Sequence, residues 1–218
     1  MQRTPAASVK CVLVGNSAVG KTSLIDAYTK KRFNDNYVPT TFDNYSGTVN
    51  VDKKQIQIDL SDTSGDPEFD SLRPLSFAEA NVFLLCFKVT DNASWNSLTD
   101  HWLPEIRAVA PHVPVILVGT QEDLRWCHYA PREVVDPKRV RKFAEKQNVD
   151  FIECSALTKK NLKELFDRAI MKGLENTAQR FQPPPLQTTK KPLVYAPPVE
   201  KSRPSLKDGF RRIIRKIL

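Results

Sequence analysis

The stretch VKCVLVGNSAVGKT at residues 9–22 decides the fold. Its first part, residues 9–14, is a short apolar run rich in valine, which indicates a buried strand. Residues 15–22 fit the pattern G-x-x-x-x-G-K-[ST], in which glycines let backbone N–H groups converge on phosphate oxygens at a helix N-terminus. Lys21 would place a positive charge on the β- and γ-phosphates, and the Thr22 hydroxyl would bind Mg²⁺. Strand, loop and helix together predict a nucleoside triphosphate site.

Outward from this stretch, short apolar runs alternate with helical patterns. A strictly alternating segment at 55–60, preceded by a compatible segment at 45–51, predicts an antiparallel hairpin at one edge of the sheet. The alternation as a whole predicts an α/β fold with a mostly parallel sheet, helices on both faces and ligands at the carboxyl ends of the strands. The other expected strands are 82–87, 115–118 and 151–154, and the expected helices are 21–31, 94–109, 137–147 and 161–174.

Charge and proline are concentrated at the C-terminus. From residue 181 onward there are nine Lys and Arg against two Asp and Glu, so that +7 of the net charge of +8 lies there, together with seven of the 16 prolines. This predicts one domain over residues 1–180 and a Pro-rich flexible linker over 181–205. No apolar run is long enough for a transmembrane helix and residues 1–8 lack a signal-peptide pattern, which predicts a cytoplasmic protein. The four cysteines form no C-x-x-C pair, which argues against a zinc site.

Two further motifs complete the site. Asp62-Thr63-Ser64-Gly65 places a carboxylate three residues before a glycine, so that Asp62 can hold Mg²⁺ through water while the Gly65 N–H meets the γ-phosphate. After the strand at 115–118 comes Gly119-Thr120-Gln121-Glu122-Asp123, and after the strand at 151–154 comes Ser155-Ala156-Leu157. The Asp123 carboxylate can accept both N–H donors of a guanine edge, which adenine cannot supply. The sequence therefore predicts GTP and GDP as ligands.

In this order the motifs resemble those of the Ras-superfamily small GTPases, and within them the Rho family. Residues 37–45, YVPTTFDNY, are similar to a Rac-like first switch, and residues 72–77, LRPLSF, are similar to the Rho second switch. The resemblance covers residues 8–178 and implies a P-loop NTPase G domain with a six-stranded sheet. It implies that Thr40 reaches Mg²⁺ and the γ-phosphate, and that effectors meet Phe42, Asp43, Tyr45 and the second switch.

The resemblance also implies that Phe33 packs on the guanine and that Ala156 offers its N–H to the base. Catalytic roles fall to Lys21, Thr40 and the position of Asp66, and the metal ligands would be Thr22, Thr40 and, through water, Asp62. The predicted nucleotide-binding residues are Gly15, Asn16, Ser17, Ala18, Val19, Gly20, Lys21, Thr22, Phe33, Tyr37, Thr40, Asp62, Gly65, Thr120, Gln121, Asp123, Ser155, Ala156 and Leu157.

Two departures from the family pattern concern hydrolysis. Ser17 stands where the family has Gly, and Asp66 stands where it has the Gln that orients the attacking water. A carboxylate beside an anionic γ-phosphate is repelled by about 1 kcal/mol in water. Ser17 adds a side chain where an arginine finger must pass. We therefore expect slow turnover that activating proteins do not accelerate; the alternative is that Asp66 acts as a general base through a shifted water.

Other departures concern nucleotide exchange. Gln121 replaces the usual Lys over the base, so exchange would quicken, and Ser61 replaces a Trp that contacts exchange factors, which leaves those partners open. Asp123 and Ser155 lie 32 residues apart, several fewer than is usual in the Rho family, which predicts a shortened insert helix around residues 126–136.

The C-terminus lacks the prenylated cysteine of a typical Rho protein, because no Cys follows Cys154. Residues 206–218 instead have apolar positions at helical spacing with basic residues between them, which predicts an amphipathic helix on an anionic membrane. The alternatives are a partner groove of calmodulin type, a nuclear-import cluster and a solvated basic end. The apolar positions are Leu206, Phe210, Ile213, Ile214 and Ile217, and the basic ones are Lys207, Arg211, Arg212, Arg215 and Lys216.

Two hypotheses follow from these features. The first is a cycling GTPase with normal hydrolysis, whose γ-phosphate orders the two switches. The second, which Ser17 and Asp66 favour, is a mostly GTP-loaded, monomeric protein that recruits effectors on the cytosolic face of the plasma membrane or endomembranes. Kinship would connect it with actin, polarity or trafficking signalling. No nucleic-acid partner is expected.

Overall fold

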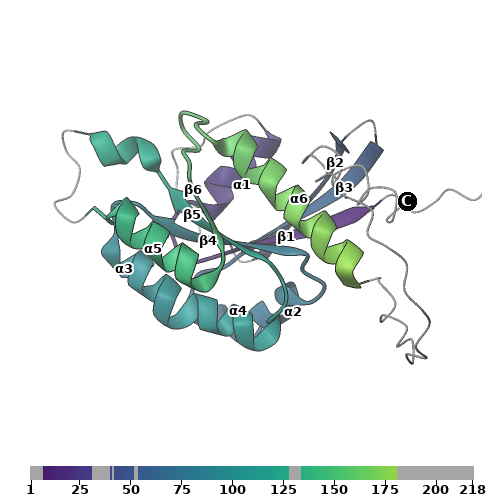
Figure 1. The fold of residues 1–218 in the computed structure, drawn as a ribbon, viewed down its shortest axis with the longest axis horizontal. Coiled ribbons are helices and arrows are strands. Elements are labelled where there is room, and N and C mark those ends of the chain that lie inside the picture. Colours follow the sequence, from purple (N-terminus) through teal and green to yellow (C-terminus); the bar gives the residue numbers. More distant parts are fainter. Residues whose placement is uncertain (1–6, 31–39, 41, 52–53, 128–133, 181–218) are drawn as a thin grey trace, which may run out of the picture.

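The computed structural model describes residues 7–30, 40, 42–51, 54–127 and 134–180, and these form a six-stranded sheet between two layers of helices (Figure 1). The strand order is β2-β3-β1-β4-β5-β6, and the pair β2–β3 is antiparallel while the other four pairs are parallel. The strands are β1 (Ser8–Val14), β2 (Phe42–Val51), β3 (Lys54–Thr63), β4 (Val82–Lys88), β5 (Val115–Thr120) and β6 (Asp150–Glu153).

Helices cover both faces of this sheet. On one face α1 (Lys21–Thr29) and α6 (Leu162–Arg180) pack on residues of β1, β3 and β4. On the other face lie α2 (Arg73–Phe77), α3 (Asn92–Ser97), α4 (Leu103–Val109) and α5 (Pro137–Gln147). Figure 1 shows the two layers above and below the sheet. The predicted fold class, a mostly parallel six-stranded sheet with one antiparallel edge strand and helices on both faces, is confirmed.

The helix expected at residues 94–109 differs from the prediction. It begins at Asn92, and α3 is followed by a π-helical turn, η2 (Leu98–Trp102), before α4 begins. In this turn the N–H of Leu103 donates to the carbonyl of Leu98, five residues earlier. The next residue, Pro104, has no N–H to donate, so the regular ladder cannot continue through it.

Two boundaries also differ. The last helix continues past residue 174 to Arg180, and its end is held by bonds from the Asn176 side chain to the carbonyl of Asn81 (3.0 Å) and from Asn81 to Thr177 (3.0 Å). A short 3₁₀ helix, η3 (Glu122–Trp126), ends where the shortened insert helix was expected, and residues 134–136 are not helical. The rest of that expectation, the linker and the C-terminal segment lie outside the described residues. No helix in the described ranges combines the length and apolarity that crossing a membrane requires.

Candidate functional site

The loop after β1 has a backbone that favours glycine at two positions. Gly15 (φ 142°) and Gly20 (φ 99°) lie in the left-handed region, and a Cβ on Gly15 would come within 2.2 Å of the Cys86 carbonyl oxygen on β4. Gly20 caps α1 without a side-chain hydrogen bond, and the first turn has no acidic residue. The N–H groups at the start of α1 are therefore left for an external acceptor, which a phosphate can be.

Lys21 lies across this loop. Its side chain is 6 % exposed, and its Nζ donates to the carbonyl oxygens of Gly15 (2.8 Å) and Asn16 (2.9 Å). Burial lowers the pKa of Lys21, and Cys86 and Asp62 oppose that shift. The ammonium group thus spans the loop, where it can also meet phosphate oxygens.

Oxygen atoms from three segments converge beside Lys21. The Thr22 hydroxyl donates to Asp62 Oδ2 (2.5 Å) and lies 2.7 Å from the Thr40 hydroxyl. Asp62 Oδ1 is buried and has no hydrogen-bond partner in the described chain, and burial raises the pKa of Asp62 to about 6. Hard oxygen donors around an unpartnered carboxylate oxygen fit Mg²⁺, whose charge would favour the ionised form of Asp62. The three predicted metal ligands are thus brought together.

The end of β3 lies directly against the phosphate loop. A Cβ added to Gly65 would come within 2.2 Å of the Ser17 nitrogen and 2.3 Å of the Asn16 carbonyl carbon. No residue larger than glycine fits there without movement of the backbone. Asp66 follows, is exposed, and accepts a hydrogen bond from the backbone N–H of Glu68 (3.0 Å), which caps a short 3₁₀ helix, η1 (Pro67–Phe69).

The two loops predicted to contact the base are joined to each other and to the phosphate loop. Thr120 donates to the carbonyl of Val19 (2.5 Å), and the Glu122 N–H donates to the carbonyl of Cys154 (3.1 Å). Ser155 has no exposed surface, whereas Leu157 is 55 % exposed. Gln121 has a left-handed backbone (φ 57°) and its amide nitrogen lies 3.6 Å from the point where a Gly20 Cβ would be. Asp123 is partly buried at the start of η3, and Ala156 is 8 % exposed.

The predicted effector residues lie on β2. Phe42 packs edge to face with Phe69 of η1 at 5.9 Å between ring centroids, so the first switch contacts the segment just before the second. Tyr45 is partly buried beneath Lys30, whose ammonium lies 5.3 Å from the ring centroid, and Asp43 is exposed. Phe33 and Tyr37 lie outside the described residues, so their predicted roles remain predictions.

A cluster that the sequence did not reveal joins the loop after β3 to the phosphate loop. We name it the Arg73 bracket, formed by Arg73, Trp102 and Glu105. Arg73 is fully buried and donates to the carbonyls of Ser64 (3.4 Å) and Asp66 (3.3 Å). It also donates twice to Glu105 (3.1 and 3.3 Å), and its guanidinium lies 4.3 Å from the Trp102 ring centroid.

The bracket reaches the phosphate loop through Trp102. The indole N–H donates to Asn16 Oδ1 (2.6 Å), and the Asn16 amide donates to the Ser97 hydroxyl (3.2 Å). The only sequence signal was the spacing of Trp102 and Glu105 on one helical stretch, which does not identify partners 86 and 32 residues away in the sequence. Residues of η2 and α4 therefore contact both the phosphate loop and the loop after β3.

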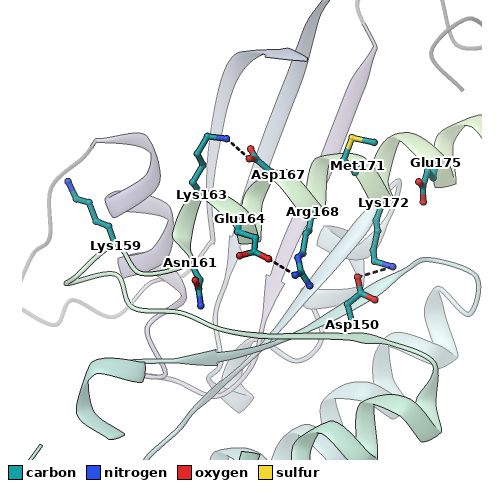
Figure 2. Close-up of a pocket in the computed structure, with 10 residues that line it drawn as sticks. All are labelled: Asp150, Lys159, Asn161, Lys163, Glu164, Asp167, Arg168, Met171, Lys172 and Glu175. Atoms are coloured by element: carbon teal, nitrogen blue, oxygen red, sulfur yellow. Dashed lines mark hydrogen bonds and ion pairs between the residues drawn. The ribbon is translucent and has the colours of Figure 1, made fainter. Parts of the chain in front are cut away.

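A surface hollow of about 660 Å³ lies elsewhere, along α6 (Figure 2). Its lining consists largely of charged side chains that pair with each other, such as Lys172 with Asp150 at 3.1 Å. None of the predicted nucleotide residues lines it.

Comparison with known proteins agrees with this geometry. The model of the Ras family matches residues 10–175. The chain is 45 % identical over 184 residues to the Rho-related GTP-binding protein RhoV of Rattus norvegicus, and the same identity and length hold for RhoV of Mus musculus and of Homo sapiens. Each alignment covers 80 % of this chain and 78 % of the relative. The chain therefore belongs to the Rho family of Ras-related small GTPases, signalling switches that bind GTP and GDP and hydrolyse GTP.

Proposed function

We propose that this chain is a Rho-family switch with impaired hydrolysis, which remains mostly GTP-loaded and recruits effectors at anionic membranes. The observation that carries the proposal is the hydrogen bond of the Asp66 carboxylate to the Glu68 N–H. Asp66, which stands at the water-positioning residue of the family, is thus hydrogen-bonded to the backbone of its own loop.

In this proposal the nucleotide is bound by the loops that converge around Lys21. The N–H groups at the start of α1 and the Lys21 ammonium contact the phosphates, Gly65 contributes its N–H, and Asp123 selects guanine. Thr22, Thr40 and Asp62 would hold Mg²⁺, which when bound offsets negative charge on the phosphate oxygens. The unpartnered Oδ1 of Asp62 supports this assignment.

Asp66 suits water positioning poorly for two reasons. Its side chain is one methylene shorter than that of Gln, and its carboxylate is an acceptor only, so it cannot donate a hydrogen bond to the γ-phosphate. In addition, leaving the cap would give up the bond to Glu68, which is worth about 1 kcal/mol in such caps. Both effects lower the fraction of molecules with a correctly placed water.

Ser17 would add a second obstacle. It is exposed, and its nitrogen lies where a Gly65 Cβ would clash, so its side chain begins at the tightest point between the two loops. An arginine finger from an activating protein must enter next to this point, and such a finger accelerates hydrolysis by about 10³ to 10⁵. We therefore expect resistance to activating proteins.

The rival function is a conventional cycling GTPase. The exposure of Asp66 favours it, because its second carboxylate oxygen can act as a general base through a shifted water while Oδ1 accepts from Glu68. The intact Thr22, Thr40 and Asp62 oxygens are consistent with both functions.

Partner recognition would use β2 and the second switch. Because Phe42 packs on Phe69, an effector bound to β2 would also restrain the segment that leads into the second switch. Ser61 stands where the family has a Trp that contacts exchange factors; it is 4 % exposed and donates to Asn44 (2.7 Å), so it offers such factors little surface. Together with Gln121 near the base, this favours spontaneous nucleotide exchange.

Membrane recruitment is assigned to the C-terminal segment. Residues 206–218 would form a basic amphipathic helix, connected to the domain by the Pro-rich residues 181–205, and this helix would bind the anionic leaflet. Flotation with anionic vesicles tests this: the full chain should bind, and a chain that ends at residue 200 should not.

Single-turnover hydrolysis of GTP by the purified chain tests the central proposal. We expect a slow rate that a Rho-activating domain does not change, and partial recovery in the double variant Ser17→Gly, Asp66→Gln. Glu68→Gln, which neutralises an exposed carboxylate in the same region, is the matched control. An ordinary rate with normal acceleration in the unaltered chain would establish the cycling GTPase instead.

A further inference from the structure

Helix α5 carries a strong excess of positive charge. Five of its eleven residues are Lys or Arg and one, Glu145, is acidic, whereas residues 1–180 as a whole carry only +1. Asp136 caps the helix start. Arg139 lies over the Trp95 ring and bonds Asn96, but no ion pair joins Lys138, Lys142 or Lys146 to a carboxylate of the described chain.

These three lysines form a single row. Positions i, i+4 and i+8 lie one above another on a helix, so Lys138, Lys142 and Lys146 follow one line about 12 Å long. The buried residues of α5, Val140 and Ala144, lie on the opposite side. All three members of this lysine row are exposed.

On helix α6, residues four apart carry opposite charges instead of like charges. Lys163 pairs with Asp167 and Glu164 pairs with Arg168, each four residues apart, as Figure 2 shows. Opposite charges at this spacing stabilise a helix and like charges destabilise it by a similar amount. The lysine row is therefore a local electrostatic cost that an external anion would relieve.

The C-terminal end of α5 lies at the same edge of the sheet as the last turns of α6. Asn148 ends α5 two residues before β6 begins, and Asn81, just before β4, bonds Asn176 and Thr177 in the last turns of α6. Because β4 and β6 are parallel, both points lie at the amino edge of the sheet. The two helices cover opposite faces of the sheet and only their C-terminal ends share this edge, so a surface along the edge would meet the Lys146 end of the row. The nucleotide loops lie at the carboxyl edge and would stay accessible.

The composition of the row fits a lipid surface better than a protein. The exposed large apolar residues of the described chain are Leu72, Leu75, Val109, Trp126 and Leu157, and none of them is on α5. Protein interfaces are centred on buried aromatic and apolar anchors, whereas a line of lysines without one matches a layer of anionic headgroups.

We propose that the lysine row Lys138, Lys142 and Lys146 is a second membrane-contact surface, which orients the domain on an anionic lipid leaflet. This rests on the proposed membrane role of the C-terminal segment. One anchoring signal gives weak, reversible binding, and a polybasic patch is a common second signal.

The test uses the full chain and flotation with phosphatidylcholine vesicles, with and without phosphatidylserine. The row variant is Lys138→Gln, Lys142→Gln, Lys146→Gln, and the matched control with the same loss of charge is Lys163→Gln, Arg168→Gln, Lys172→Gln. A tail variant, Arg211→Gln, Arg212→Gln, Arg215→Gln, tests the C-terminal segment separately. Each lysine near an anionic surface strengthens partitioning about fivefold, so the row variant should bind phosphatidylserine vesicles about 100-fold more weakly.

The control should lose much less, and the row variant should bind GTP as the parent does. Equal partitioning of the row variant and the parent would overturn the proposal, and so would an equal loss in the control, which would indicate bulk charge. Lost binding to acidic polypeptides with unchanged vesicle binding would also overturn it, in favour of a protein partner. An unaffected tail variant would overturn the tail proposal alone, because the row variant is measured independently.

Discussion

The indole N–H of Trp102 donates to Oδ1 of Asn16 at 2.6 Å and thereby connects the π-turn after α3 to the phosphate loop. The same ring lies under the Arg73 guanidinium, which holds the carbonyls on both sides of Gly65. The two loops that would enclose the γ-phosphate thus share one support. Their relative position depends on residues that do not touch nucleotide.

Replacing Trp102 by Phe tests this support. The aromatic packing remains while the bond to Asn16 is lost, so we expect a loss of about 1 kcal/mol in the free energy of unfolding and faster dissociation of GDP. Chemical denaturation and release of a fluorescent GDP measure the two effects. Trp126→Phe is the control, because Trp126 is 80 % exposed; equal dissociation rates in the two variants would contradict the proposed support.

Replacing Arg73 by Ala should be more damaging. The change removes the buried partner of Asp70 and Glu105 and opens a space next to Trp102, while His101 remains 3.5 Å from Glu105. Breaking a buried ion pair costs about 3–5 kcal/mol, and because Glu105 is 18 % exposed we expect a loss at the lower end of that range. Urea unfolding measures the loss. Arg168→Ala removes an arginine from an exposed pair on α6 and should change stability little. Similar losses in the two variants would show that burial of Arg73 does not matter.

Parts of this structure were predictable because their causes are local. The bounds of α5 were predicted correctly at both ends, since Asp136 and Pro137 mark its start and Asn148 adopts the left-handed conformation that ends it. The phosphate loop followed from its glycine spacing. By contrast, β3 extends through the polar Ser61, Asp62 and Thr63, because neighbouring β1 and β2 supply hydrogen-bond partners that hydropathy does not reveal. The Arg73 bracket was missed for the same reason: its contacts span more than 30 residues of sequence.

Cysteine reactivity provides a check on the core. Burial raises the pKa of Cys11, Cys86 (to about 12) and Cys154, so these thiols stay protonated and shielded at neutral pH. Cys127 is the exposed member of the four. A thiol probe at pH 7 should therefore label one cysteine in the native protein and all four after denaturation. Rapid labelling of a second cysteine in the native state would contradict the burial of β1, β4 or the segment after β6.

Adding one methyl group at Gly65 tests the contact between the two loops of the site. The Cβ of Gly65→Ala would lie 2.2 Å from the Ser17 nitrogen, and neither atom belongs to a flexible side chain, so one backbone must move. We expect the variant to lose most of the thermal protection that GTP and Mg²⁺ give the parent, because its N–H and the phosphate loop can no longer contact the same γ-phosphate. Gly47→Ala on β2 is the matched control, since nothing lies within 4 Å of its added Cβ. If Gly65→Ala kept the full protection by GTP, the two loops would not close on the nucleotide as proposed; loss of stability without nucleotide in both variants would instead indicate a general effect on the sheet.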